Sequence, residues 1–166
     1  MTVDGTAEAL PGNIMIQCRN RWGDTWEEVE AEFDFPVPLG NAGYVKTNEI
    51  VDQPFPFKVI FFASVLDHLN RTDEKSIGSV IRSSLYEIIT ISRKFDLKIL
   101  AAPLLKAGWR MPPSGAFNAM LTVVEEFPDY EAKLEIYSVL QEHHDYLTSL
   151  AKSYGLYNKN ADSLTS

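Results

Sequence analysis

The sequence is poor in cysteine and in long hydrophobic runs. Cys18 is the only cysteine among 166 residues, so no disulfide can form within the chain, as is typical of a reducing, cytoplasmic compartment. The longest apolar stretches, Phe57–Val65 and Ile99–Leu105, have the length of strands, whereas a membrane helix needs roughly 20 apolar residues. Residues 1–12 lack the basic and apolar regions of a secretory signal. We therefore expect a cytoplasmic protein that does not contact a membrane.

Basic residues are also scarce. The chain carries 15 Lys and Arg against 23 Asp and Glu, which gives a formal net charge of -8. A protein that grips the nucleic-acid backbone needs a basic footprint, so nucleic-acid binding is not expected. A small anion is still possible as a ligand, because backbone N–H groups at the start of a helix attract phosphate without any lysine.

The length fits one domain, since domains commonly hold about 100–200 residues. Residues 1–12 and 157–166 are small and polar, so we expect a flexible N-terminal segment and a flexible C-terminal tail. Residues 13–156 are then a single domain.

Predicted strands and helices alternate along that domain. Short apolar segments predict strands over Asn13–Cys18, Gly43–Thr47, Phe57–Ala63, Leu97–Ala102 and Ala132–Val139. Helices are predicted from Thr25, over residues 72–93, from Ser114 and over Glu142–Tyr154. This alternation implies crossover connections, and hence an α/β fold with helices on both faces of a largely parallel sheet. Ligands of such folds bind beyond the carboxyl ends of the strands, here at the loop Lys106–Pro113.

Local signals refine the helix ends. The sequence Thr25-Trp-Glu-Glu28 has the spacing of a capping box, Ser114 is a candidate N-cap, and Gly155 stands where a helix-ending glycine is expected. The longest predicted helix carries one apolar stripe, made of Ile77, Val80, Ile81, Leu85, Ile88 and Ile89.

From Ser76 onward, the order of elements resembles a macro domain, the α/β/α module known for binding ADP-ribose. The run ILAAPLLKAGWRMPP has the family's strand and its loop between two prolines, here Pro103 and Pro113, with Gly108 on one of the loop's glycines. Upstream, LGNAGYVKTNEI and FPFKVIFFASV resemble two further strands of the family. The resemblance, over 13–154, implies a three-layer α/β/α fold with a mixed, largely parallel sheet.

The segment NIMIQCRN resembles the family's first strand and loop, and it places Asn20 where the family contacts the distal ribose. Two departures stand out. A run of glycines that wraps the diphosphate is replaced by Arg21–Trp26, and the second phosphate loop keeps Gly108 alone. Glycines allow positive φ and close approach of the backbone to phosphate, so their loss predicts a changed pocket.

The loop Lys106–Pro113 is the first candidate site. Lys106 and Arg110 offer charge, Gly108 offers backbone, and Trp109 can stack on a base or ribose. Ser114 and the N–H groups near Gly115–Phe117 would face an anion. The alternative is an ordinary strand-to-helix loop with a tryptophan packed over the end of the sheet.

The segment Asn20–Trp26 is the second candidate site. Here Asn20 would bond a ribose hydroxyl, Arg21 a phosphate and Asp24 an adenine amino group. Alternatively, Asp24 and Thr25 cap a helix and the tryptophans belong to the core or to a protein interface.

Other polar residues favour structural roles. His143 and His144 are adjacent on a predicted helix, so they point about 100° apart and do not chelate one metal. Cys18 lies in an apolar segment, which favours a buried, inert thiol. The run Asp67–Asn70 follows a strand end, where it could supply polar groups to the same edge as the loop Lys106–Pro113, but these residue types are equally common in turns. No metal site and no cofactor are predicted.

Two functions follow. The first is a divergent macro-like domain that binds ADP-ribose or a related nucleotide, weakly or with altered specificity. No catalytic residue is assigned, and ADP-ribosyl hydrolysis is a minor alternative within it. The second is a non-enzymatic scaffold that has lost ligand binding and acts through a protein partner or a homo-oligomer. Its interface residues would be Trp22, Trp26, Trp109 and the segments Phe35–Pro38 and Pro54–Pro56.

Overall fold

Ten helices and strands and one short 3-10 helix follow one another in the computed structural model, which describes residues 2–4, 13–34, 36–52, 55–67, 74–107, 110–137 and 141–156. In chain order they are β1 (Thr2–Asp4), α1 (Asn13–Trp22), α2 (Asp24–Ala31), β2 (Ala42–Lys46), the 3-10 helix η1 (Thr47–Glu49), β3 (Val59–Leu66), α3 (Glu74–Lys94), β4 (Ile99–Pro103), α4 (Pro113–Glu125), β5 (Lys133–Tyr137) and α5 (Gln141–Ser153).

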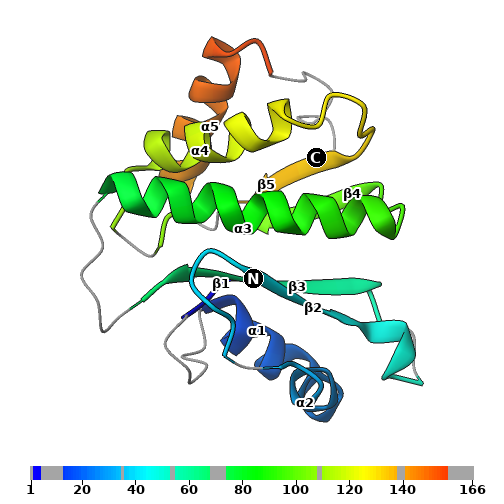
Figure 1. The fold of residues 1–166 in the computed structure, drawn as a ribbon. Helices are drawn as coiled ribbons and strands as arrows, with labels where there is room; N and C mark the ends of the chain where they lie inside the picture. The colour runs from blue at the N-terminus through cyan, green and yellow to red at the C-terminus, as the bar shows by residue number, and fades with distance from the viewer. Residues whose placement is uncertain are drawn as a thin grey trace.

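Hydrogen bonds join the strands into two sheets. In the first sheet the order is β1-β3-β2, with β1 parallel and β2 antiparallel to β3, and in the second β4 runs parallel to β5. In Figure 1, α1 and α2 cover one face of the first sheet and α3 covers the other. The predicted three-layer α/β/α class and the mixed, largely parallel strand pairing are confirmed.

Strand β3 is the centre of the molecule. Its residues Ile60 and Phe62 belong to a core shared with α1 and α2, whereas Ala63 and Val65 belong to a second core under α3 and α4. A strand that is buried on both faces reads as a continuous apolar run, which is why VIFFASVL lacks alternation. The prediction of a central strand here is confirmed.

The apolar stripe predicted for the longest helix is also confirmed. Residues Ile77, Ile81, Leu85, Ile88 and Ile89 of α3 are all at most 8% exposed. This stripe packs on β3 and on α4, whose own buried face includes Phe117 and Met120. Val124, near the end of the same helix, is 36% exposed.

The strand predicted over Asn13–Cys18 is wrong, because these residues form most of helix α1. Met15 and Cys18 are buried and Trp22 is half-buried, a spacing of three and then four residues that belongs to a helix. The parallel strand beside β3 is β1, whose residues Thr2–Asp4 were expected to be a flexible segment.

Two predicted N-caps are wrong as well. Helix α2 begins at Asp24 after Gly23 (φ +48°), and no side chain caps it, so the box of Thr25 and Glu28 does not form. Helix α4 begins at Pro113, with Ser114 inside its first turn, because the fixed φ of proline suits the first helical position.

The predicted C-terminal stop at Gly155 is confirmed. This glycine has φ +71°, its N–H donates to the carbonyl of Lys152, and the N–H of Leu156 donates to the carbonyl of Ala151. This pair of bonds is a Schellman motif. None of the helices in the described ranges is both long and apolar enough to cross a membrane.

We expect Gly43→Ala to destabilise the protein by about 1–3 kcal/mol, because an added Cβ would lie 2.9 Å from two ring carbons of the buried Phe33. In contrast, Gly78→Ala places its Cβ 3.3 Å from the flexible end of Met111 and gains about 1 kcal/mol of helix propensity. Urea unfolding of both variants checks the difference. Equal losses of stability would contradict the packing argument.

Candidate functional site

The carboxyl ends of β3 and β4 meet at one edge of the molecule. Past the end of β4, Arg110 Nη1 donates to the backbone carbonyl oxygen of Asp67, which follows β3, at 3.1 Å. In Figure 1 the first turns of α3 and α4 lie at this same edge. The structure therefore brings the loop Lys106–Pro113 to the place where ligands of α/β folds bind.

Buried side chains hold this loop down. Leu105, Ala107 and Met111 are 2%, 3% and 8% exposed and belong to the core under α3. Ala107 has φ +51°, a conformation that costs an L-residue about 1–2 kcal/mol and that glycine adopts freely. The loop makes a turn suited to glycine, yet an alanine methyl occupies it and packs inward.

The first turn of α4 closes the same edge. It contains no acidic residue, and its helix-internal hydrogen bonds begin with the N–H of Ala116, which donates to the carbonyl of Pro112. The N–H groups of Ala116 and Phe117, predicted to face an anion, are thus inside the helical bonding pattern. Those of Ser114 and Gly115 remain at the positive end of the helix dipole.

The other predicted loop residues take different places. Lys106 is half-exposed, and among the described residues no ion pair engages it. Arg110 is tied to Asp67, so it positions the loop. Gly108 and Trp109 lie outside the described residues.

The second predicted group, Asn20, Arg21 and Asp24, lies at the opposite end of β3. Its neighbour Trp22 packs on Phe55 and Phe57, with ring centroids 5.2 and 5.8 Å apart, and both phenylalanines precede β3. A strand of eight residues is roughly 25 Å long. The structure therefore does not assemble the two predicted groups into one site.

The reason is the helical conformation of α1. A strand over Asn13–Cys18 would end with Asn20 at the ligand edge, whereas a helix of ten residues turns the chain and carries it about 15 Å. Asn20 and Arg21 are exposed in the last turns of α1, and Arg21 lies over the ring of Trp22 at 5.5 Å. Asp24 is exposed at the start of α2.

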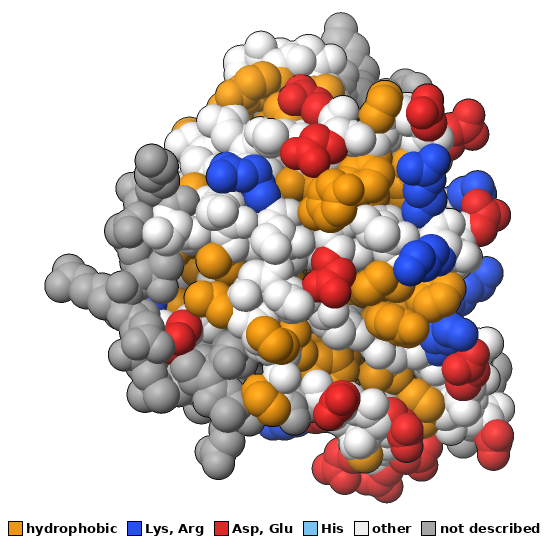
Figure 2. Space-filling model, viewed as in Figure 1, with side chains coloured by type: hydrophobic (Ala, Val, Ile, Leu, Met, Phe, Trp, Pro, Cys, Tyr) orange, Lys and Arg blue, Asp and Glu red, His pale blue; other side chains and the backbone are white. Residues whose placement is uncertain are grey.

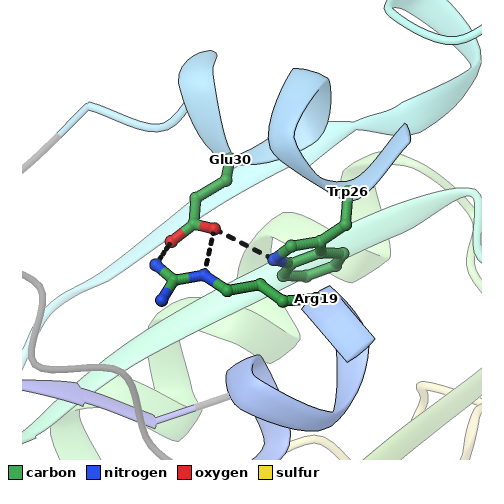
Figure 3. A network of polar contacts seen from close by, with 3 residues as sticks. All are labelled: Arg19, Trp26 and Glu30. Atoms are coloured by element: carbon green, nitrogen blue, oxygen red, sulfur yellow. Dashed lines mark hydrogen bonds and ion pairs between the residues drawn. The ribbon is translucent and has the colours of Figure 1, made fainter. Parts of the chain in front are cut away.

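A polar network that the sequence analysis missed joins α1 to α2 (Figure 3). Arg19 donates through Nε and Nη2 to the two carboxylate oxygens of Glu30, at 2.9 and 2.5 Å. The fully buried Trp26 donates its indole N–H to the same carboxylate at 3.1 Å. This hydrogen bonding raises the pKa of the Arg19 guanidinium. The spacing of four residues between Trp26 and Glu30 was the available signal.

Two hollows formed by described residues lie away from the carboxyl edge. One is an open depression of about 400 Å³ beside Arg19, Glu27, Glu30 and Ala31. The Arg19 guanidinium in this depression is already paired with Glu30, so the depression is a weak site for an anion. The other is an apolar cavity of about 20 Å³ between α3, α4 and the second sheet, too small for an organic ligand.

Acidic side chains gather over α2, at the lower end of the view in Figure 2. Asp24, Glu27, Glu28, Glu32 and Asp34 are all exposed there.

Burial raises the pKa of the Cys18 thiol, in keeping with an inert cysteine. Within the described ranges no three His, Cys, Asp or Glu residues form a cluster that could hold a metal.

We expect Glu30→Ala to cost about 2–3 kcal/mol of unfolding free energy, because it leaves the buried indole N–H of Trp26 without an acceptor. The partner change Arg19→Ala is expected to cost under about 1 kcal/mol, since Arg19 is 43% exposed and Trp26 keeps its acceptor. The control Glu27→Ala should stay within about 0.5 kcal/mol. Chemical denaturation measures all three, and an equal cost for the first two would contradict this account.

Comparisons with known proteins address the fold. No protein-family model matches the sequence, and no curated protein matches it. Among solved structures, the chain is similar to the macrodomain of Mycobacterium tuberculosis DarG, with a TM-score of 0.61, 17% sequence identity, and coverage of 84% of this chain and 87% of that chain. At this identity the likeness concerns the fold alone. The chain therefore has the fold of a macrodomain.

Proposed function

We propose that this protein binds ADP-ribose or a related nucleotide at the carboxyl edge of β3 and β4, weakly or with altered specificity. The observation that carries the proposal is the convergence of the loop Lys106–Pro113 and the first turn of α4 at that edge, fastened by the bond from Arg110 to Asp67. The macrodomain fold supports the choice of ligand, because macro domains are known for binding ADP-ribose.

Each loop residue has a distinct role in this proposal. Lys106 supplies the charge that attracts a diphosphate, and Ser114 supplies an N–H at the positive end of α4. Gly108 offers backbone to the phosphates and Trp109 stacks on the base or ribose. Arg110 keeps the loop in place by its bond to the main chain.

Weak or altered binding in this proposal follows from the conformation of Ala107 and from the charge of the protein. Ala107 adopts a left-handed conformation with its methyl buried, so the loop is held to the core on one side. The net charge of -8 opposes an anionic ligand, and the acidic side chains around α2 add to that field. Affinity therefore depends on the few donors at the edge.

Asn20, Arg21 and Asp24 are not part of the site in this proposal, because they lie with Trp22 at the amino end of β3. This separation provides a matched control. Lys106→Glu and Arg21→Glu make the same type of charge reversal at opposite ends of the strand.

Titration calorimetry with ADP-ribose tests the proposal. We expect Lys106→Glu and Gly108→Glu to weaken binding at least tenfold, about 1.4 kcal/mol, through repulsion and obstruction of the phosphates. Arg21→Glu should bind as the unchanged protein does. Thermal shift in the same ligand provides a second readout, since a ligand of the folded state raises its stability. No heat and no shift at millimolar ADP-ribose would refute the proposal.

A second candidate function is a protein-binding surface at the amino end of β3. There Trp22, Phe55 and Phe57 pack against one another, and Phe57 is 41% exposed. Trp26 is fully buried and takes no part in such a surface. Aromatic residues of this kind are typical anchors of interfaces. This candidate replaces the first if ADP-ribose gives no response.

A further inference from the structure

Among the strands of the described residues, β2 lies at the outer edge of the three-stranded sheet and pairs with β3 on one side. Ser64 donates to the carbonyl of Asn41, and Thr47 donates to that of Lys58, at the two ends of the ladder. In an antiparallel pair the bonded positions alternate, so the main chain of Gly43 and Val45 points toward β3. The N–H and C=O groups of Ala42, Tyr44 and Lys46 point outward.

Within the described residues, this edge has one hydrogen-bond partner. The N–H of Ala42 donates to Glu87 Oε2 of α3 at 2.5 Å. The outward groups of Tyr44 and Lys46 have none in that part of the chain, and a row of such groups is a template for another strand.

Side chains on the α3 face of β2 make the edge aromatic. Tyr44 is 44% exposed, and its ring lies 5.2 Å from the ring of Phe95 and 6.3 Å from that of Phe61. Lys46 Nζ lies 4.9 Å above the Phe95 ring. Figure 2 shows a hydrophobic patch flanked by basic side chains on the right of the view, where β2 and the end of α3 meet in Figure 1.

We propose that the β2 edge binds a second copy of this chain, the two β2 strands pairing antiparallel about a two-fold axis at Tyr44. In this register Tyr44 faces its own copy, and Lys46 faces Ala42 of the other copy. The two Tyr44 residues exchange N–H···O=C bonds, and each Lys46 N–H donates to an Ala42 carbonyl. The Ala42 N–H keeps its bond to Glu87.

Charge complementarity supports this occupant and this register. The edge carries Glu87 at its Ala42 end and Lys46 at its other end, so a two-fold axis between them brings each lysine next to a glutamate. Lys46 now pairs with Glu49, which is 61% exposed, and such surface pairs are weak enough to exchange. An axis centred on Lys46 would place two lysines opposite each other, and an axis centred on Ala42 would place two glutamates close together, so both registers are disfavoured by repulsion.

Sedimentation velocity over a concentration series tests the pairing. The unchanged chain is expected to shift from 18.7 kDa toward twice that mass as concentration rises. Tyr44→Lys sets two ammonium groups face to face on the axis and should leave a folded monomer, with circular dichroism as the check of folding. The matched control Tyr86→Lys changes another exposed tyrosine, whose ring packs on Phe127, and should still dimerise.

A charge exchange tests the register. Lys46→Glu should weaken the dimer at least tenfold, and adding Glu87→Lys should recover most of that loss, because the Ala42 N–H can then donate to the carbonyl of residue 46 in the other copy. Failure of the double variant to recover would overturn the register. A chain that stays monomeric at every concentration, or that pairs equally well with Tyr44→Lys, would overturn the proposal. Binding of ADP-ribose by Tyr44→Lys is expected to be unchanged, so the two proposals fail separately.

Discussion

The burial of β3 on both faces is the constraint on which the rest of the structure depends. One face of the strand receives α1 and α2 through Ile60 and Phe62, and the other receives α3 through Ala63 and Val65. Because α4 packs on α3, the second core also reaches the second sheet. Both cores therefore converge on one strand, and the two ends of that strand become the two places where polar and aromatic residues gather.

Those two ends differ in chemistry. At the carboxyl end, main-chain donors of α4 and the side chain of Lys106 lie beside a loop tied down by Arg110. At the amino end, Trp22 packs against Phe55 and Phe57 next to an acidic helix. The nucleotide-binding proposal rests on the first arrangement, and the alternative proposal of a protein-binding surface rests on the second.

The connection between α1 and α2 shows how a helix replaces an expected strand. NIMIQC is a short apolar segment when it is considered alone, but Met15, Cys18 and Trp22 are spaced as on one face of a helix. The pattern becomes unambiguous only with Trp26 and Val29 of α2, which bury their own face in the same core. The Trp26 indole and the Arg19 guanidinium both donate to the Glu30 carboxylate, which links the two helices. A short window of sequence does not contain that information.

Predictions from local pattern succeeded where one face or one conformation dominates. The stripe of α3 and the apolar run of β3 require burial whatever their neighbours are, and Gly155 ends its helix because a left-handed residue is needed there. The N-caps at Thr25 and Ser114 were wrong because the helices begin at Asp24 and Pro113, so the cap positions are Gly23 and Pro112, two residues before the predicted ones. At a helix end, single backbone preferences outweigh a side-chain hydrogen bond.

The amino-acid sequence by itself determined the α/β class, the central strand, the amphipathic face of α3 and the placing of Lys106–Pro113 after a strand. It did so because hydrophobic periodicity and glycine and proline conformations act over a few residues. Only the tertiary structure decided that Asn20 and Arg21 lie far from that loop, that Arg110 donates to the main chain of Asp67, and that β2 lies at an edge of the described sheet. Each of these depends on contacts between segments that are distant in sequence, which local hydrophobic patterns do not record.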